Sequence, residues 1–223
     1  MMDQNIESHV QQVLHTAQQR PTKFEASIDR VFFGHGKLLL SGEYFVLDGA
    51  KALGIPLCVG QSMSIKYRPS FSPMLKWFAK DWKNQVWIEA NFELWHFNFQ
   101  GPGEITAEIL FLQKILKAAR AQNCHFLREE AEIIVETNLE FPREWGLGSS
   151  STLIYNIASW AYVSPFELLH QSMEGSGYDV ACAQSNGPIV FEKSLSGPKW
   201  SLVNFKPRFS ESLYFVYLGK KQD

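Results

Sequence analysis

The chain has 223 residues, of which 45% are hydrophobic and 20% are charged, and its formal net charge at pH 7 is −2. This length and apolar content suffice to bury a core, which argues against a disordered chain. The near-neutral charge supplies no basic footprint, so we expect no nucleic-acid partner and favour a small-molecule substrate. No run of about 18 apolar residues occurs, and the N-terminus lacks a signal-peptide pattern, so we expect neither a membrane span nor export.

The three cysteines, Cys58, Cys124 and Cys182, are widely spaced and form no Cys-x-x-Cys pair. An odd number of unpaired thiols is typical of a reducing compartment, where disulfides are rare. We therefore expect a cytoplasmic protein with three structural thiols. The sequence leaves a homodimer open.

The first segment of the chain predicts a helix. Residues Met1–Arg20 place apolar side chains at helical spacing before Pro21. Because the polar face is rich in glutamine and poor in lysine, we favour a packing helix over a membrane anchor. We assign residues 1–29 to an N-terminal helical extension.

The next segments predict strands. Lys23–Leu47 is strand-like but interrupted at Gly34–Gly36, which predicts two strands around a glycine turn, and Ala52–Tyr67 predicts another strand pair. The aromatic-rich stretch Phe71–Phe99 predicts a long hairpin. Its aromatic face is explained best as buried core, and the alternative is an apolar wall beside a ligand.

The second half of the chain alternates helices and strands. Ile105–Ala121 predicts a helix with one apolar face, and Ala131–Thr137 predicts a strand. Later segments predict a helix from Leu153 to Ala161, a short helix from Pro165, and strands at Pro188–Phe191 and Ser212–Leu218. This order predicts a mixed α/β (α+β) fold, a mixed sheet packed with helices.

A glycine- and serine-rich loop lies between the strand Ala131–Thr137 and the helix that follows. It consists of Gly146, Leu147, Gly148, Ser149, Ser150 and Ser151. Glycines permit a tight turn that exposes backbone N–H groups, and a helix N-terminus attracts anions, so the loop predicts a phosphate cradle. The alternative is an ordinary serine N-cap. The loop is not a Walker motif, because no lysine follows Gly148.

Phosphoryl transfer also requires a cation and a group that orients or deprotonates the attacking hydroxyl. Lys37, which follows Gly36, is the best candidate for the cation, although a lone lysine is more often a solvated surface residue. Asp179 is the candidate for the base because it lies beside a small apolar segment, where a carboxylate is costly unless it is used. The alternative for Asp179 is a structural N-cap.

Three segments resemble the GHMP kinases, which include galactokinase, homoserine kinase, mevalonate kinase and phosphomevalonate kinase. They are Gly36–Tyr44, Gly146–Ser151 and Gly175–Ala181. The resemblance spans roughly Arg30 to the C-terminus. The Gly-Tyr-Asp-Val-Ala stretch is similar to the subgroup of mevalonate-kinase-like proteins named for a Gly-Tyr-Asp-Ile-Ala motif.

The resemblance implies a role for each matching residue. The loop residues from Gly146 to Ser151 would bind the phosphates of ATP, with Ser150 touching Mg²⁺. Lys37 would lie beside Asp179 and neutralise charge, while Asp179 would orient or deprotonate the acceptor hydroxyl. Glu43 and Ser176 would support this cluster or the substrate. The carboxylate that completes the Mg²⁺ site in the family has no clear match in this chain.

The resemblance also implies the fold and the reaction. We expect residues 30–223 to form the N-terminal ATP-binding domain of a GHMP kinase, a fold like domain 2 of ribosomal protein S5. The chain ends without the family's C-terminal domain, and we favour a fragment over a natural short form. The implied function is ATP-dependent phosphorylation of a hydroxyl or phosphate, with mevalonate or phosphomevalonate as the favoured acceptor. The alternative is a nucleotide-binding or regulatory protein without turnover.

Overall fold

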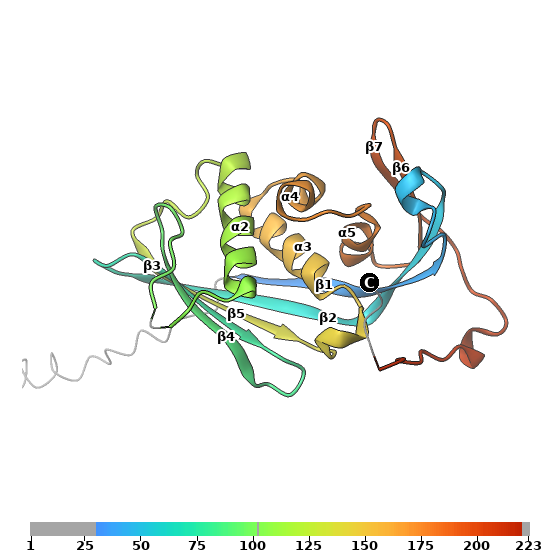
Figure 1. Ribbon diagram of the computed structural model, residues 1–223, viewed down its shortest axis with the longest axis horizontal. Coiled ribbons are helices and arrows are strands. Elements are labelled where there is room, and N and C mark those ends of the chain that lie inside the picture. The colour runs from blue at the N-terminus through green and yellow to red at the C-terminus, as the bar shows by residue number, and fades with distance from the viewer. Residues whose placement is uncertain (1–29, 102, 220–223) are drawn as a thin grey trace, which may run out of the picture.

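The computed structural model of the protein describes residues 30–101 and 103–219. The helical extension expected over residues 1–29 lies outside these residues. Within the described part, seven strands form one mixed sheet and four α-helices pack on it (Figure 1). The mixed α/β prediction is confirmed.

The long strand β2 organises the sheet. The strand order is β4-β3-β5-β2-β6-β7, and β1 pairs with β2 along its other edge. Only β3 and β5 pair in parallel, and the other pairs are antiparallel. The strands are β1 (Arg30–Ser41), β2 (Ala52–Pro69), β3 (Met74–Lys80), β4 (Val86–Glu93), β5 (Ala131–Leu139), β6 (Ile189–Ser194) and β7 (Gly197–Leu202).

Two predictions about the first strands are wrong. The segment expected to form two strands around a glycine turn is the single strand β1, and Ala52–Tyr67, expected as a strand pair, belongs to the single strand β2. A Cβ on Gly34 would lie 3.0 Å from the carbonyl oxygen of Thr152, and one on Gly36 would lie 2.9 Å from that of Val59. These glycines therefore allow close packing of β1 instead of forming a turn.

The predicted hairpin within Phe71–Phe99 is confirmed as the antiparallel pair β3 and β4. Trp77, Phe92 and Phe97 are buried in the core, as the core interpretation predicts. The chain does not continue straight after β4. It turns back, so that Phe99 forms a β-bridge with Phe92.

The four helices lie on one face of the sheet (Figure 1). They are α2 (Ala107–Gln122), α3 (Ser149–Ala161), α4 (Pro165–Ser172) and α5 (Tyr178–Ala183). The side chains of Thr106 and Ser164 cap α2 and α4 by accepting hydrogen bonds from backbone N–H groups of the first turn. The three helices predicted within the described residues correspond to α2, α3 and α4. In the part of the chain that the structure describes, no helix is long and apolar enough to cross a membrane.

The two faces of the sheet differ in chemistry. The face under the helices carries the core, including Met63, Ile65 and Val135 from the central strands β2 and β5. On the other face, ion pairs cross the strands, with Lys80 2.5 Å from Glu136. This alternation follows from the two-residue period of a strand, and it keeps the uncovered face hydrated.

A buried arginine fixes two loops beside α2. Arg120 is 9% exposed, and its guanidinium donates hydrogen bonds to the carbonyl oxygens of Leu94, Trp95, Phe126 and Leu127. Desolvation lowers the pKa of Arg120, but a guanidinium stays charged in proteins. The four hydrogen bonds that the guanidinium donates compensate its buried charge and tie both loops to the helix.

The end of the chain differs from the prediction. The strand predicted at Pro188–Phe191 is confirmed as β6, which pairs with the unpredicted strand β7. The strand predicted at Ser212–Leu218 is wrong. Ser210–Ser212 is a short 3-10 turn, and the following residues are exposed and pair with no strand of the described chain. A continuous apolar run predicted a strand there, but a strand needs a pairing partner.

Candidate functional site

The glycine- and serine-rich loop connects a short 3-10 helix, Arg143–Trp145, to α3. Gly146 and Gly148 adopt left-handed backbone conformations with φ of 70° and 90°. Gly148 is itself the N-cap of α3, and no side chain caps this helix end. The serine N-cap alternative is therefore wrong, and the first-turn N–H groups of α3 have neither an acceptor within the helix nor a side-chain cap.

Strand β1 carries Lys37 to this loop. The backbone N–H of Lys37 donates to the carbonyl oxygen of Leu147 at 2.9 Å. A Cβ on Gly148 would lie 3.1 Å from Cγ of Lys37, so the lysine stem packs directly against the loop glycine. Lys37 is thus not a solvated surface lysine, since its side chain is only 15% exposed.

Helix α5 supplies the carboxylate. Nζ of Lys37 lies 2.9 Å from Oδ1 of Asp179, whose side chain is 28% exposed. The N-cap of α5 is Gly177, with φ of 95°, and Asp179 lies one residue inside the helix. The N-cap alternative for Asp179 is therefore wrong. Three segments far apart in the sequence, β1, the loop and α5, meet at one point.

Tyr178 belongs to the same cluster, although the sequence alone suggested no role for it. Its hydroxyl accepts a hydrogen bond from Lys37 Nζ at 2.6 Å, and the ammonium lies 4.9 Å from the ring centroid. Burial raises the pKa of Tyr178 far above its usual range, and the charge of Asp179 adds to the shift. The hydroxyl is therefore neutral near pH 7.

Burial also raises the pKa of the neighbouring Cys182 to about 12, with a further contribution from Asp179. Its side chain is fully buried against Gly54, where a Cβ would lie 2.6 Å from Sγ. Cys182 is therefore a neutral packing thiol, in agreement with the structural role expected for it.

A cavity of about 520 Å³ opens above this cluster. Lys37, Glu43 and Tyr178 line it together with the start of the loop, Glu144–Leu147. Glu43 lies in the turn after β1, so the structure brings it to the same cavity as Lys37. The segment Phe215–Leu218 forms the opposite wall, where Phe215 and Tyr217 contact the Trp145 ring at centroid distances of 5.8 and 6.4 Å.

The loop serines face a second, smaller cavity of about 90 Å³. Ser149 and Ser150 line it with Trp87 of β4 and Arg143. The Arg143 guanidinium lies 3.8 Å from the Trp87 ring centroid and forms an ion pair with Glu108 at 3.3 Å. The Trp87 indole N–H is buried and has no partner among the described residues. Sequence reasoning missed Arg143, and only the alternative of an aromatic wall pointed to Trp87.

Three of the predicted site residues are buried and line neither cavity with a polar side chain. Leu147 packs in a small core with Leu139 and Phe141 and holds the loop in place. Ser151 is buried, and the Ser176 hydroxyl accepts a bond from the backbone N–H of Tyr178 at 3.4 Å. Their positions support the loop and the start of α5.

The described residues contain no group of three or more histidine, cysteine, aspartate or glutamate side chains that could hold a metal ion. Ser150 offers a hydroxyl oxygen at the smaller cavity, beside the start of α3. Such a site suits an ion that arrives with a nucleotide, because Mg²⁺ usually keeps water and phosphate ligands.

No protein-family model and no curated protein matches the sequence significantly. Solved structures do match. The L. major mevalonate kinase in complex with R-mevalonate has a TM-score of 0.57 at 16% identity, over 82% of this chain and 54% of that one. A D-glycero-D-manno-heptose 1-phosphate kinase from Bacteriodes thetaiotaomicron has a TM-score of 0.56 at 16% identity, over 79% of this chain and 60% of that one.

The Streptococcus pneumoniae phosphomevalonate kinase in complex with phosphomevalonate and AMPPNP has a TM-score of 0.53 at 17% identity, over 78% of this chain and 59% of that one. The protein therefore has the fold of the N-terminal domain of GHMP kinases, as the resemblance implied. The chain spans a little over half the length of these structures. Identities this low establish the fold and do not distinguish a subgroup.

Proposed function

We propose that the protein is an ATP-dependent kinase that transfers the γ-phosphoryl group to a small-molecule hydroxyl or phosphate. The observation that carries the proposal is the 2.9 Å contact between Lys37 of β1 and Asp179 of α5, directly beside the uncapped start of α3. A cation, a carboxylate and an anion-binding loop are the three parts that phosphoryl transfer needs. The GHMP-kinase fold supports the same class.

Each part has a role in the proposed reaction. The first-turn N–H groups of α3 bind the nucleotide phosphates, and Lys37 offsets the charge that develops during transfer. Asp179 orients an acceptor hydroxyl and accepts its proton while the acceptor oxygen attacks phosphorus and the bond to the leaving phosphate breaks. When the acceptor is itself a phosphate, no proton needs to move and Asp179 acts through position and charge.

The two cavities suggest opposite ends for the two substrates. The cavity with Trp87 and Arg143 offers an aromatic ring, a guanidinium and an unpaired indole N–H, which suit a nucleobase next to the loop serines. The cavity with Lys37 and Glu43 would hold the acceptor. Ser150 would ligate Mg²⁺, which neutralises phosphate charge when bound.

Mevalonate and phosphomevalonate are the acceptors we propose first. Two of the solved structures with this fold are complexes with R-mevalonate and with phosphomevalonate. Mevalonate offers a hydroxyl and phosphomevalonate a phosphate, the two acceptor groups proposed, and either would lie beside Lys37 in the acceptor cavity. A cytoplasmic location remains part of the proposal.

The test measures ATP consumption by the full chain with mevalonate, phosphomevalonate and several sugars, together with ATP-dependent thermal stabilisation. We expect Asp179→Asn to lower kcat by about 100-fold or more while ATP still stabilises the protein. Asp48→Asn is the matched control, because Asp48 is exposed in the 3-10 turn after β1. Equal turnover of Asp179→Asn and the parent would refute the mechanism.

Two further outcomes separate the alternatives. Stabilisation by ATP without turnover on any acceptor would favour the nucleotide-binding or regulatory protein. If ATP neither stabilises the protein nor is consumed with any acceptor, both functions are excluded for this chain.

A further inference from the structure

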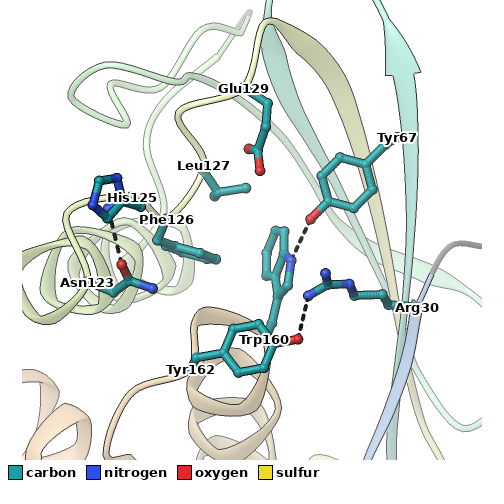
Figure 2. A pocket seen from close by; sticks show the side chains of 9 residues that line it. All are labelled: Arg30, Tyr67, Asn123, His125, Phe126, Leu127, Glu129, Trp160 and Tyr162. Atoms are coloured by element: carbon teal, nitrogen blue, oxygen red, sulfur yellow. Dashed lines mark hydrogen bonds between the residues drawn. The ribbon is translucent and has the colours of Figure 1, made fainter.

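A cavity of about 430 Å³, whose lining side chains Figure 2 shows, lies at the opposite end of α3 from the glycine-serine loop. The helix begins at Ser149 beside the loop, and Trp160 in its last turn forms part of the cavity floor. The volume is within the range of small-molecule sites. None of its lining residues belongs to the proposed kinase site, so its function does not depend on that proposal.

The floor of the cavity is apolar and ordered by packing. Phe126 and Trp160 are buried and meet edge to face, with ring centroids 4.8 Å apart and an interplanar angle of 85°. The Trp160 indole N–H donates to the Tyr67 hydroxyl at 2.8 Å, and Leu127 completes the floor. Because the rings are held before any ligand arrives, a flat or branched apolar group binds with little ordering cost.

The rim carries charges of both signs. The Arg30 guanidinium donates to the Tyr162 hydroxyl at 3.1 Å and lies 5.5 Å from the ring centroid, which leaves its other N–H groups available. Glu129 has no ion-pair partner within residues 30–101 and 103–219. Figure 2 shows both charged groups directed toward the space around the Trp160 ring.

The backbone at the rim is strained. Leu127 and Tyr162 both adopt left-handed backbone conformations, with φ of 58° and 55°, which residues other than glycine rarely adopt. The Tyr162 ring nevertheless stands 76% exposed above the cavity. Tyr162 is the C-cap of α3, where a left-handed residue commonly ends a helix, and this helix end places its ring at the rim.

We propose that this cavity binds a free amino acid with an aromatic or branched apolar side chain. Arg30 pairs with the α-carboxylate, Glu129 pairs with the α-ammonium, and the floor of Phe126, Leu127 and Trp160 takes the side chain. A ligand with only negative charge would meet Glu129, and one with only positive charge would meet Arg30. A small zwitterion with an apolar body matches both groups.

Calorimetric titration of the full chain with L-phenylalanine tests the proposal against two analogues. Phenethylamine lacks the carboxylate and 3-phenylpropionate lacks the ammonium, and we expect each to bind about tenfold more weakly than phenylalanine. Glu129→Gln should lower the affinity for phenylalanine to that of the parent for 3-phenylpropionate. Arg30→Met should lower it to that of the parent for phenethylamine. If Arg30→Met does not fold, Arg30→Lys keeps the charge, loses the planar fork and should still weaken binding.

Two control variants complete the experiment. Glu130→Gln makes the same charge change next to the cavity without altering its lining, and Lys37→Ala disrupts the proposed kinase site. Both should bind phenylalanine as the parent does. The proposal is overturned if both analogues bind as tightly as phenylalanine, if Glu129→Gln leaves its affinity unchanged, or if Lys37→Ala abolishes binding. The proposal is also overturned if phenylalanine shows no binding at about 10 mM, a concentration at which even a very weak affinity would be detected.

Discussion

Removal of the Tyr178 hydroxyl is the sharpest single test of the Lys37 cluster. Tyr178→Phe keeps the aromatic ring 4.9 Å from the Lys37 ammonium and the 2.9 Å ion pair with Asp179, but it deletes the 2.6 Å hydrogen bond. A hydrogen bond to a charged group contributes about 1.5–3 kcal/mol. Because the Lys37 side chain is 15% exposed, water recovers part of this loss. We therefore expect the free energy of unfolding to fall by about 1–2 kcal/mol.

The same change should loosen the position of Lys37 during phosphoryl transfer. A loss of about 1.4 kcal/mol of transition-state stabilisation lowers kcat about tenfold, and KM for ATP should change less. Because burial raises the pKa of Tyr178, the hydroxyl stays protonated, and the ratio of parent to variant rates should be constant between about pH 6 and pH 9.

Urea denaturation and steady-state kinetics measure the two effects. Tyr155→Phe on α3 is the matched control, since the described residues offer the Tyr155 hydroxyl no hydrogen-bond partner and its removal should cost little. Unchanged unfolding free energy and unchanged kcat in Tyr178→Phe would refute the positioning role. A rate ratio that changes steeply within this pH range would refute the argument from the raised pKa.

Three further predictions concern the loop, the buried arginine and the buried thiol. Gly148→Ala should lose ATP-dependent thermal stabilisation, because its Cβ would lie 3.1 Å from Cγ of Lys37. Gly197→Ala is the control: Gly197 has φ of 107° and open space around it, so the variant should carry only backbone strain and keep the response to ATP. Arg120→Met should lower the free energy of unfolding, measured by urea denaturation, by about 3 kcal/mol, because buried carbonyl oxygens lose their donors. Lys117 is exposed on the same helix, so Lys117→Met should change the free energy of unfolding little. Between pH 9.0 and about pH 10, stability should fall by up to about 1.4 kcal/mol per pH unit, because the unfolded Cys182 thiol ionises there while the folded thiol, with its pKa of about 12, keeps its proton. Above this window the unfolded Tyr178 hydroxyl ionises as well, since its folded pKa is also raised. Cys182→Ala should flatten this decline in urea titrations at several pH values, and an identical slope in parent and variant would contradict the assignment.

Much of the architecture could be predicted because its signals are local. Helix α2 has an apolar face at helical spacing and a threonine cap, and β5 alternates buried and partly buried residues. The pattern of Gly146–Ser151 predicts a tight turn before a helix. Its backbone geometry depends on glycines at two positions with positive φ, a property of these residues themselves.

The errors arose where the same local signal has two tertiary explanations. Gly34 and Gly36 mark either a turn or a close approach, and only the packed backbones of Thr152 and Val59 decide for the second. Ser212–Leu218 has an apolar run typical of a strand but no partner among the described strands. The second cavity was also missed, because Trp87 and Arg143 are distant in sequence and meet only after folding.

By itself, the sequence determined the mixed α/β class, and it predicted the glycine- and serine-rich loop, Lys37 and Asp179 as candidate site residues. The resemblance to GHMP kinases implied that this lysine and aspartate meet. Only the tertiary structure decided how they meet, since their contact depends on β1 passing close to the loop and on α5 packing beside β1 and β2. It also decided that Tyr178 joins them and that a further cavity, lined by Phe126 and Trp160, lies at the far end of α3. Such contacts join segments more than a hundred residues apart, and no local propensity encodes them.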